Sequence, residues 1–134
     1  MPQRTTEPLW LTLTVVDAIH TDQIREHGGL LGVRDENALE SAVARPQHKW
    51  NYEPKTDLAA LGAACAFGFV RIHPYNDGNK RVALLTMLTF VSITGYDVDA
   101  PDDDVLMTML ALAAGHLTES DLAAWLRAHL RSIK

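Results

Sequence analysis

The chain has 134 residues, a length that suits one domain with a buried core and is too short for two. Hydrophobic residues make up 47% of the sequence and charged residues 22%, proportions typical of a globular rather than a disordered protein. The formal net charge of −5 argues against a main function in sequence-independent binding of nucleic-acid phosphates. Any cationic site must therefore be local.

The sequence contains neither a disulfide framework nor a targeting signal. Cys65 is the single cysteine, which excludes an internal disulfide and a cysteine-based zinc site and favours a small buried residue. Residues 1–8 lack the apolar segment of a signal peptide. The longest apolar run, residues 58–70, is shorter than the roughly 20 residues that a membrane span requires. We therefore expect a soluble, cytoplasmic protein without a membrane partner.

In chain order, the first half of the sequence predicts two capped helices. Thr12 is expected to cap a helix that runs to about His27 and stops at Gly28-Gly29. Asp35 is expected to cap a second helix through about Ala44, closed by Pro46. Helical periodicity is absent from residues 45–56, where we predict a loop or a short hairpin.

Two strongly apolar helices are predicted next. One starts at Thr56 or Asp57 and covers about 58–72. It is expected to end near residue 72, because Pro74 disfavours helical geometry at His73. The other runs from about Asn79 to a stop at Gly95. Both are apolar on nearly every face, so they are expected at the centre of the domain.

Two final helices, at 102–114 and 118–132, complete the expected architecture. Thr118, with Asp121 three residues later, has the pattern of a helix N-cap. A helix-turn-helix interpretation is disfavoured, because the carboxylates of 118–121 would repel DNA, and no direct nucleic-acid partner is expected. The sequence thus predicts a single all-α domain, 1–134, with about six helices and the polar turn between the two central ones.

The residues of that polar turn are unfavourable for the stability of the helix that follows it. Asn79, Lys80 and Arg81 fall in the first turn of the fourth helix, where free N–H groups disfavour cations by roughly 0.3–1 kcal/mol each. A bound anion would remove the conflict, and Gly78 would let the backbone approach it. The turn therefore predicts a polyphosphate site.

Two neighbouring side chains extend this site into a phosphoryl-transfer constellation. Asp77 offers a hard oxygen ligand for Mg²⁺, and His73 offers a base whose ordinary pKa lies near neutrality. Taken singly, each residue has a structural explanation: an Asp-Gly turn, a packed histidine before proline, and cations extended over the surface. The sequence contains no second nucleotide-binding motif.

The nine residues His73–Arg81 resemble the Fic motif, His-Pro-Phe-x-Asp/Glu-Gly-Asn-Gly/Lys-Arg, with Tyr75 in place of Phe. The similarity to the Doc (death-on-curing) branch of that family covers roughly 10–130 and leaves 1–9 as an N-terminal extension. Its further matches are Gly28-Gly29-Leu30 with Gly32, Tyr52-Glu53 before Thr56-Asp57-Leu58, Arg71, and Ala113-Ala114-Gly115.

The resemblance implies an enzyme that uses ATP and Mg²⁺. It implies that His73 is the general base, that Asp77 is the Mg²⁺-linked acid, and that Lys80 and Arg81 complete the catalytic set. The implied phosphate-binding residues are Asn76, Gly78, Asn79, Lys80 and Arg81.

The residue at position 80 bears on the reaction type. The commoner Fic motif has Gly there, lining an anion hole in adenylyl transferases. Doc toxins resemble this chain in having Lys, and they are known as kinases that phosphorylate elongation factor Tu. The resemblance thus implies a Ser/Thr kinase toxin that inhibits translation, with Fic-type AMP transfer and a non-catalytic binding module as alternatives.

The resemblance implies two further features. The sequence has no match to the inhibitory pattern Ser/Thr-x-x-x-Glu-Gly/Asn of some relatives, so a separate antitoxin is the expected partner. Lys49, Trp50 and Tyr52 are expected in a flap that docks the target by strand addition, with packing of the aromatic rings on the core as the alternative. The histidines outside the motif show no metal-ligand spacing and are expected to be surface or packed residues: His20, His27, His48, His116 and His129.

Overall fold

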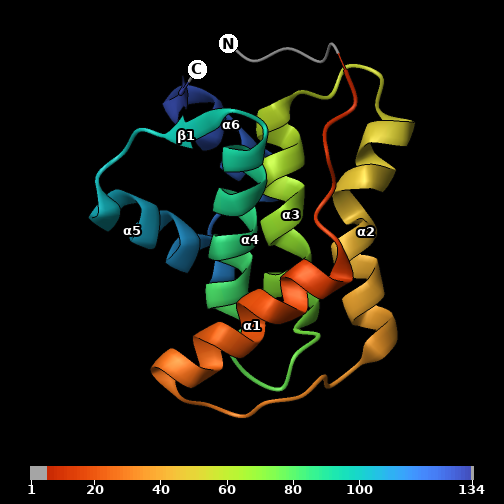
Figure 1. Ribbon diagram of the computed structural model, residues 1–134. Helices are drawn as coiled ribbons and strands as arrows, with labels where there is room; N and C mark the ends of the chain where they lie inside the picture. Colours follow the sequence, from red (N-terminus) through yellow and green to blue (C-terminus); the bar gives the residue numbers. More distant parts are fainter. Residues whose placement is uncertain (1–5, 134) are drawn as a thin grey trace.

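The computed structural model describes residues 6–133, which contain six helices and two three-residue strands (Figure 1). The all-α class is therefore confirmed. Residues 1–5 of the expected N-terminal extension lie outside that range. The elements are α1 (Leu13–His27), α2 (Glu36–Tyr52), α3 (Leu58–Ile72), α4 (Asn79–Ile93), β1 (Tyr96–Val98), α5 (Asp102–Ala113), α6 (Glu119–His129) and β2 (Leu130–Ser132).

Helix α3 occupies the centre of the fold, packed against α2, α4 and α6 (Figure 1). Its side chains are buried almost all round, as its composition predicts, with Leu61 2% and Phe69 0% exposed. Burial of such a side chain stabilises the fold by about 1.5–3 kcal/mol. Small residues let the helices approach closely, and Gly68 lies directly against Ala42 of α2. Cys65 is buried in this core, as expected, and burial raises the pKa of its thiol.

The predicted N-caps are confirmed at four helices. The side chains of Thr12, Asp35, Asp57 and Thr118 each accept a hydrogen bond from a backbone N–H of the first turn. At α6 the carboxylate of Asp121 returns a bond to the Thr118 N–H and completes a capping box. Each such cap contributes about 1 kcal/mol to stability.

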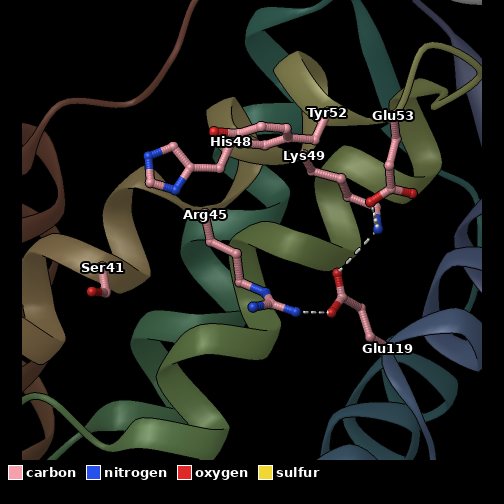
Figure 2. A pocket seen from close by; sticks show the side chains of 7 residues that line it. All are labelled: Ser41, Arg45, His48, Lys49, Tyr52, Glu53 and Glu119. Atoms are coloured by element: carbon pink, nitrogen blue, oxygen red, sulfur yellow. Dashed lines mark hydrogen bonds and ion pairs between the residues drawn. The ribbon is translucent and has the colours of Figure 1, made fainter.

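The predicted helix end at about Ala44 and the loop predicted for residues 45–52 are wrong, because α2 continues to Tyr52 with Pro46 inside it, whereas residues 53–56 are non-helical as predicted. An interior proline costs about 3 kcal/mol, but here it is buried, and contacts beyond it hold the last turns. Lys49 Nζ lies 2.9 Å from Glu53 Oε2 and 3.8 Å from Glu119 Oε2, and Figure 2 shows the end of the Lys49 side chain between Glu53, at the end of α2, and Glu119 of α6.

The expected flap is therefore not a loop, because its residues belong to the last turns of α2. Trp50 packs edge-on against Trp10, with 6.3 Å between ring centroids, as the alternative interpretation has it. Lys49 is held by its ion pairs, whereas Tyr52 is 81% exposed. Of these three residues, only Tyr52 has most of its surface exposed to solvent.

The last helix ends at His129, three residues before the predicted end. Residues 130–132 instead form β2, which pairs antiparallel with β1 in the register Tyr96↔Ser132 and Val98↔Leu130. The Asp99 N–H also donates to the His129 carbonyl at 2.7 Å, which occupies a carbonyl at the helix end. None of the helices in the described part of the chain is both long and apolar enough to cross a bilayer.

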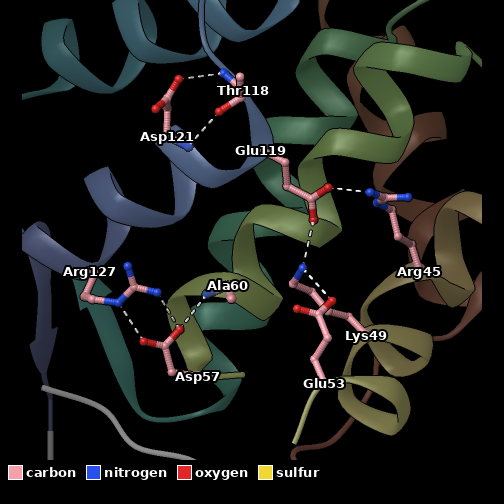
Figure 3. Close-up of polar contacts among 9 residues, drawn as sticks. All are labelled: Arg45, Lys49, Glu53, Asp57, Ala60, Thr118, Glu119, Asp121 and Arg127. Carbon is pink, nitrogen blue, oxygen red and sulfur yellow. Dashed lines mark hydrogen bonds and ion pairs between the residues drawn. The ribbon is translucent and has the colours of Figure 1, made fainter. Parts of the chain in front are cut away.

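Ion pairs connect α6 to the two helices beside it (Figure 3). Arg127 donates two hydrogen bonds to Asp57, the N-cap of α3, at 2.7 and 2.9 Å. Burial raises the pKa of Asp57, but the hydrogen bonds from Arg127 and from the Ala60 N–H outweigh it and hold that pKa below its ordinary value. Arg45 of α2 pairs with Glu119 of α6.

Candidate active site

The loop between α3 and α4 lies beside the loop between α1 and α2 at one end of the molecule (Figure 1). The first loop opens onto a shallow pocket of about 310 Å³. The seven residues predicted to form the catalytic and phosphate-binding site all line this one pocket: His73, Asn76, Asp77, Gly78, Asn79, Lys80 and Arg81.

His73 ends α3 in the left-handed conformation, with φ 53° and ψ 61°. It is the one non-glycine residue with positive φ among residues 6–133, and such residues persist only where the surroundings hold them. Its ring Nε2 lies 2.7 Å from the Val70 carbonyl oxygen. Since a carbonyl can only accept, Nε2 carries the proton of the neutral ring, and Nδ1 keeps the free lone pair.

The N-terminus of α4 has the charge conflict that the sequence predicts. Gly78 is its N-cap, with φ 78° and no side chain to accept from the first-turn N–H groups. Lys80 and Arg81 are exposed, and neither forms an ion pair within residues 6–133. Free N–H groups and two unpaired cations thus face the same pocket, an arrangement that fits an anion.

The fold itself also favours glycine at position 78. A Cβ there would lie 3.2 Å from Ile24 Cδ1 and 3.7 Å from the His20 ring, so it would meet α1. Its positive φ, which residues with a side chain rarely adopt, favours glycine as well.

The Asp77 carboxylate is exposed and held from two sides. Oδ1 accepts from the Gly78 N–H at 3.0 Å, and Oδ2 accepts from the Leu30 N–H at 3.3 Å. Gly29 makes that approach possible, since a Cβ there would lie 2.7 Å from Oδ2. Both oxygens retain lone pairs, so the carboxylate fits a ligand of Mg²⁺.

Phosphate and water would have to complete such a magnesium site. Within residues 6–133 no group of three or more His, Cys, Asp or Glu side chains is arranged to hold a metal ion. In phosphoryl-transfer sites Mg²⁺ is usually coordinated by one or two carboxylates, substrate phosphates and water.

The side chains of the two asparagines in the motif form hydrogen bonds with backbone groups. Asn79 Oδ1 accepts from the Tyr75 N–H at 3.0 Å, and its Nδ2 donates to the Tyr75 carbonyl at 2.9 Å. Asn76 Nδ2 donates to the Leu31 carbonyl at 3.3 Å. Asn79 therefore reaches the pocket with a free backbone N–H, while its amide fixes the loop shape.

Sequence reasoning missed a buried support beneath the loop. Tyr75 is 2% exposed, and its hydroxyl donates to the Asp17 carboxylate. The His20 ring stacks on Tyr75 at 3.7 Å, and its Nε2 donates to the Asp77 carbonyl at 2.9 Å. Burial, and then the Asp17 carboxylate, raise the pKa of Tyr75. A tyrosine at a phenylalanine position was the available signal, because a buried hydroxyl requires a partner.

The motif and the fold agree with the comparison to known proteins. The model of the Fic/DOC family matches residues 10–91. This chain belongs to the Fic/DOC family.

Two relatives carry the name of the Doc branch, as the resemblance implies. "Protein kinase doc" of Escherichia phage P1 is 34% identical over 111 residues, which cover 82% of this chain and 86% of that protein. "Toxin Doc" of Mycolicibacterium smegmatis is 39% identical over 83 residues, which cover 57% of this chain and 64% of that protein.

Proposed function

We propose that this protein is the toxin of a toxin–antitoxin pair and an ATP-dependent kinase of protein serine or threonine hydroxyls. The observation that carries the proposal is the pocket itself, where His73, with one free ring nitrogen, lies beside an uncapped helix N-terminus and two unpaired cations. The names of the two relatives, a protein kinase and a toxin, support the same activity.

The roles of the residues follow from their chemistry. The first-turn N–H groups of α4, with Lys80 and Arg81, would hold the phosphates of ATP. Asp77 would bind Mg²⁺, which neutralises phosphate charge when bound. His73 Nδ1 would accept the proton of the attacking hydroxyl as its oxygen bonds the γ phosphorus. The bond from that phosphorus to the β–γ bridging oxygen breaks, and ADP leaves with the electron pair.

Lys80 supports transfer of the terminal phosphate rather than of AMP. Its bulk and charge lie at the motif position where a glycine would leave space for more of the polyphosphate chain. In-line attack requires the reacting atoms to approach within roughly 3–3.5 Å, so the seating of ATP selects the bond that breaks.

The proposed target is elongation factor Tu, and the proposed consequence is inhibition of translation. Both come from the resemblance to Doc toxins. The proposed partner that restrains the toxin is a separate antitoxin, since the sequence has no match to the inhibitory pattern of some relatives.

Labelled ATP tests the reaction. The purified protein is incubated with elongation factor Tu, Mg²⁺, and ATP labelled at either the α or the γ phosphate. We expect the γ label on the target and a loss of about 10²–10⁴-fold in rate for His73→Ala. His116→Ala, which removes an exposed histidine outside the pocket, is the matched control and should retain activity.

The alternatives predict different results. Transfer of the α label would replace the kinase with an AMP transferase, and Lys80→Gly should lose γ transfer under our proposal. No transfer of either label, together with unchanged toxicity of His73→Ala in cells, would instead indicate a non-catalytic binding module.

A further inference from the structure

The backbone carbonyls at the end of α3 are held by one residue of the neighbouring loop. The Arg34 side chain donates from Nη2 to the Ile72 carbonyl at 2.6 Å and from Nε to the His73 carbonyl at 2.8 Å. The backbone N–H groups of Arg34 and Asp35 donate to the Pro74 carbonyl at 2.8 and 3.1 Å. Three successive carbonyls at the start of the motif thus have partners in positions 34 and 35.

These bonds fix the residue on which the proposed chemistry depends. Helix ends leave carbonyls without partners, and a left-handed residue other than glycine requires its surroundings to hold it. Within residues 6–133, His73 donates two local hydrogen bonds: its N–H donates to the Phe69 carbonyl at 3.2 Å, and its ring donates to the Val70 carbonyl. The two Arg34 bonds fix the peptide planes on either side of the His73 Cα, and hence the direction of its ring.

Arginine is well suited to this task. Its guanidinium carries several N–H donors in a fixed planar fork, so one side chain can serve two carbonyls that point in different directions. Its positive charge also lies favourably at the C-terminus of α3. Arg34 does not line the pocket, so its effect must pass through His73.

We propose that Arg34 is a positioning residue that holds His73 in the left-handed conformation in which Nδ1 is available as the base. The inference rests on the proposed function of His73. It adds to that function a residue from the α1–α2 loop, 39 positions before the base.

Steady-state kinetics with Arg34→Ala give the first test. We expect kcat to fall about 10- to 100-fold, the scale of a misplaced catalytic group, while KM for ATP changes less than about twofold because the phosphate contacts of α4 are untouched. Arg34→Lys, which can serve one carbonyl at a time, should recover part of kcat.

Arg127→Ala is the matched control. Like Arg34, Arg127 makes two guanidinium hydrogen bonds at an end of α3, but at the opposite end, to Asp57. Both variants should lower the melting temperature, and only Arg34→Ala should lower kcat at a temperature where both are folded. An equal loss of kcat in the two variants would show a merely structural role and overturn the proposal.

A spectroscopic measurement separates this inference from the proposed reaction. In protein with ¹⁵N-labelled histidine, two-bond ¹H–¹⁵N spectra report which ring nitrogen carries the proton, and His73→Ala identifies the His73 signals. We expect the signals of the Nε2-protonated His73 ring in the native protein and in Arg127→Ala. In Arg34→Ala these signals should be lost. Unchanged His73 signals in Arg34→Ala would overturn the positioning role even if transfer is observed. Changed signals without any transfer would support that role and contradict only the proposed kinase.

Discussion

Lys80 and Arg81 show the tension between stability and function at the scale of single residues. Both lie in the first turn of α4, where the helix carries partial positive charge, and no acidic residue accompanies them there. Natural proteins accept such local costs at functional sites, because a bound ligand removes them. The cost can be measured in the absence of ligand.

Arg81→Ala is expected to lose ATP binding and to keep or gain stability in nucleotide-free buffer. Removal of a cation from the N-terminal turn should raise the free energy of unfolding by about 0.3–1 kcal/mol. Chemical denaturation with and without ATP checks both parts.

Arg25→Ala is the matched control, and it should lower the free energy of unfolding. Arg25 is exposed in the last turn of α1, where a cation is favourable. A large destabilisation of ligand-free Arg81→Ala would contradict the interpretation and identify Arg81 as a structural residue.

At the scale of elements, the packing of α3 depends on its two glycines in different ways. A Cβ at Gly68 would lie 3.1 Å from both Cα and Cβ of Ala42 in α2, so a backbone would have to move. A Cβ at Gly62 would also meet an atom at 3.1 Å, but that atom is the end of the flexible Leu126 side chain. The same substitution should therefore have different effects at the two positions.

Gly68→Ala should be less stable than Gly62→Ala by about 1–3 kcal/mol, the usual cost of overpacking. Both variants gain the same helix propensity from alanine, so their difference isolates the contact with α2. Urea denaturation of both proteins measures it. Equal stabilities would show that α2 and α3 can separate at no cost.

The pairing of Asp57 with Arg127 predicts a dependence of stability on pH. The pKa of Asp57 is lower in the folded protein than in the unfolded chain, so its contribution is present above the ordinary aspartate pKa and is lost as pH falls through the folded value. The wild-type free energy of unfolding should therefore decrease below about pH 4.

Asp57→Asn should show a smaller decrease over that range, because asparagine keeps the N-cap but not the charge. Denaturation at a series of pH values provides the measurement. Asp97→Asn, which removes a carboxylate from an exposed pair with Arg131, is the control and should resemble the wild type more closely. Identical pH profiles for wild type and Asp57→Asn would contradict the assignment.

At the scale of the whole molecule, the site combines the α3–α4 loop with a segment distant from it in sequence, α1 and the α1–α2 loop. The α3–α4 loop supplies the pocket, the α1–α2 loop supplies Arg34 and the Leu30 N–H, and α1 supplies His20 beneath it. Gly29 and Gly32 permit this closeness, since a Cβ at either would lie within 3 Å of Asp77 or Asn76 side-chain atoms. Contacts with the α3–α4 loop therefore explain Gly29 and Gly32, two of the glycines that carry the resemblance in the α1–α2 loop.

The sequence by itself determined the features that depend on nearby residues. Caps at Thr12, Asp35, Asp57 and Thr118 act within one helical turn, and the apolar character of α3 and α4 is visible residue by residue. The motif residues also follow one another directly in the chain, so their gathering in one pocket could be predicted.

Only the tertiary structure decided the features that depend on residues far apart. Pro46 locally disfavours a helix, but the ion pairs of Lys49 and the packing of Trp50 hold α2 together beyond it. The 130–132 segment has the periodicity of a helix and becomes a strand because β1 offers it hydrogen bonds. His20 and Arg34 reach the motif across 57 and 39 residues, and hydrogen bonds at such separations leave no periodic signal in a sequence.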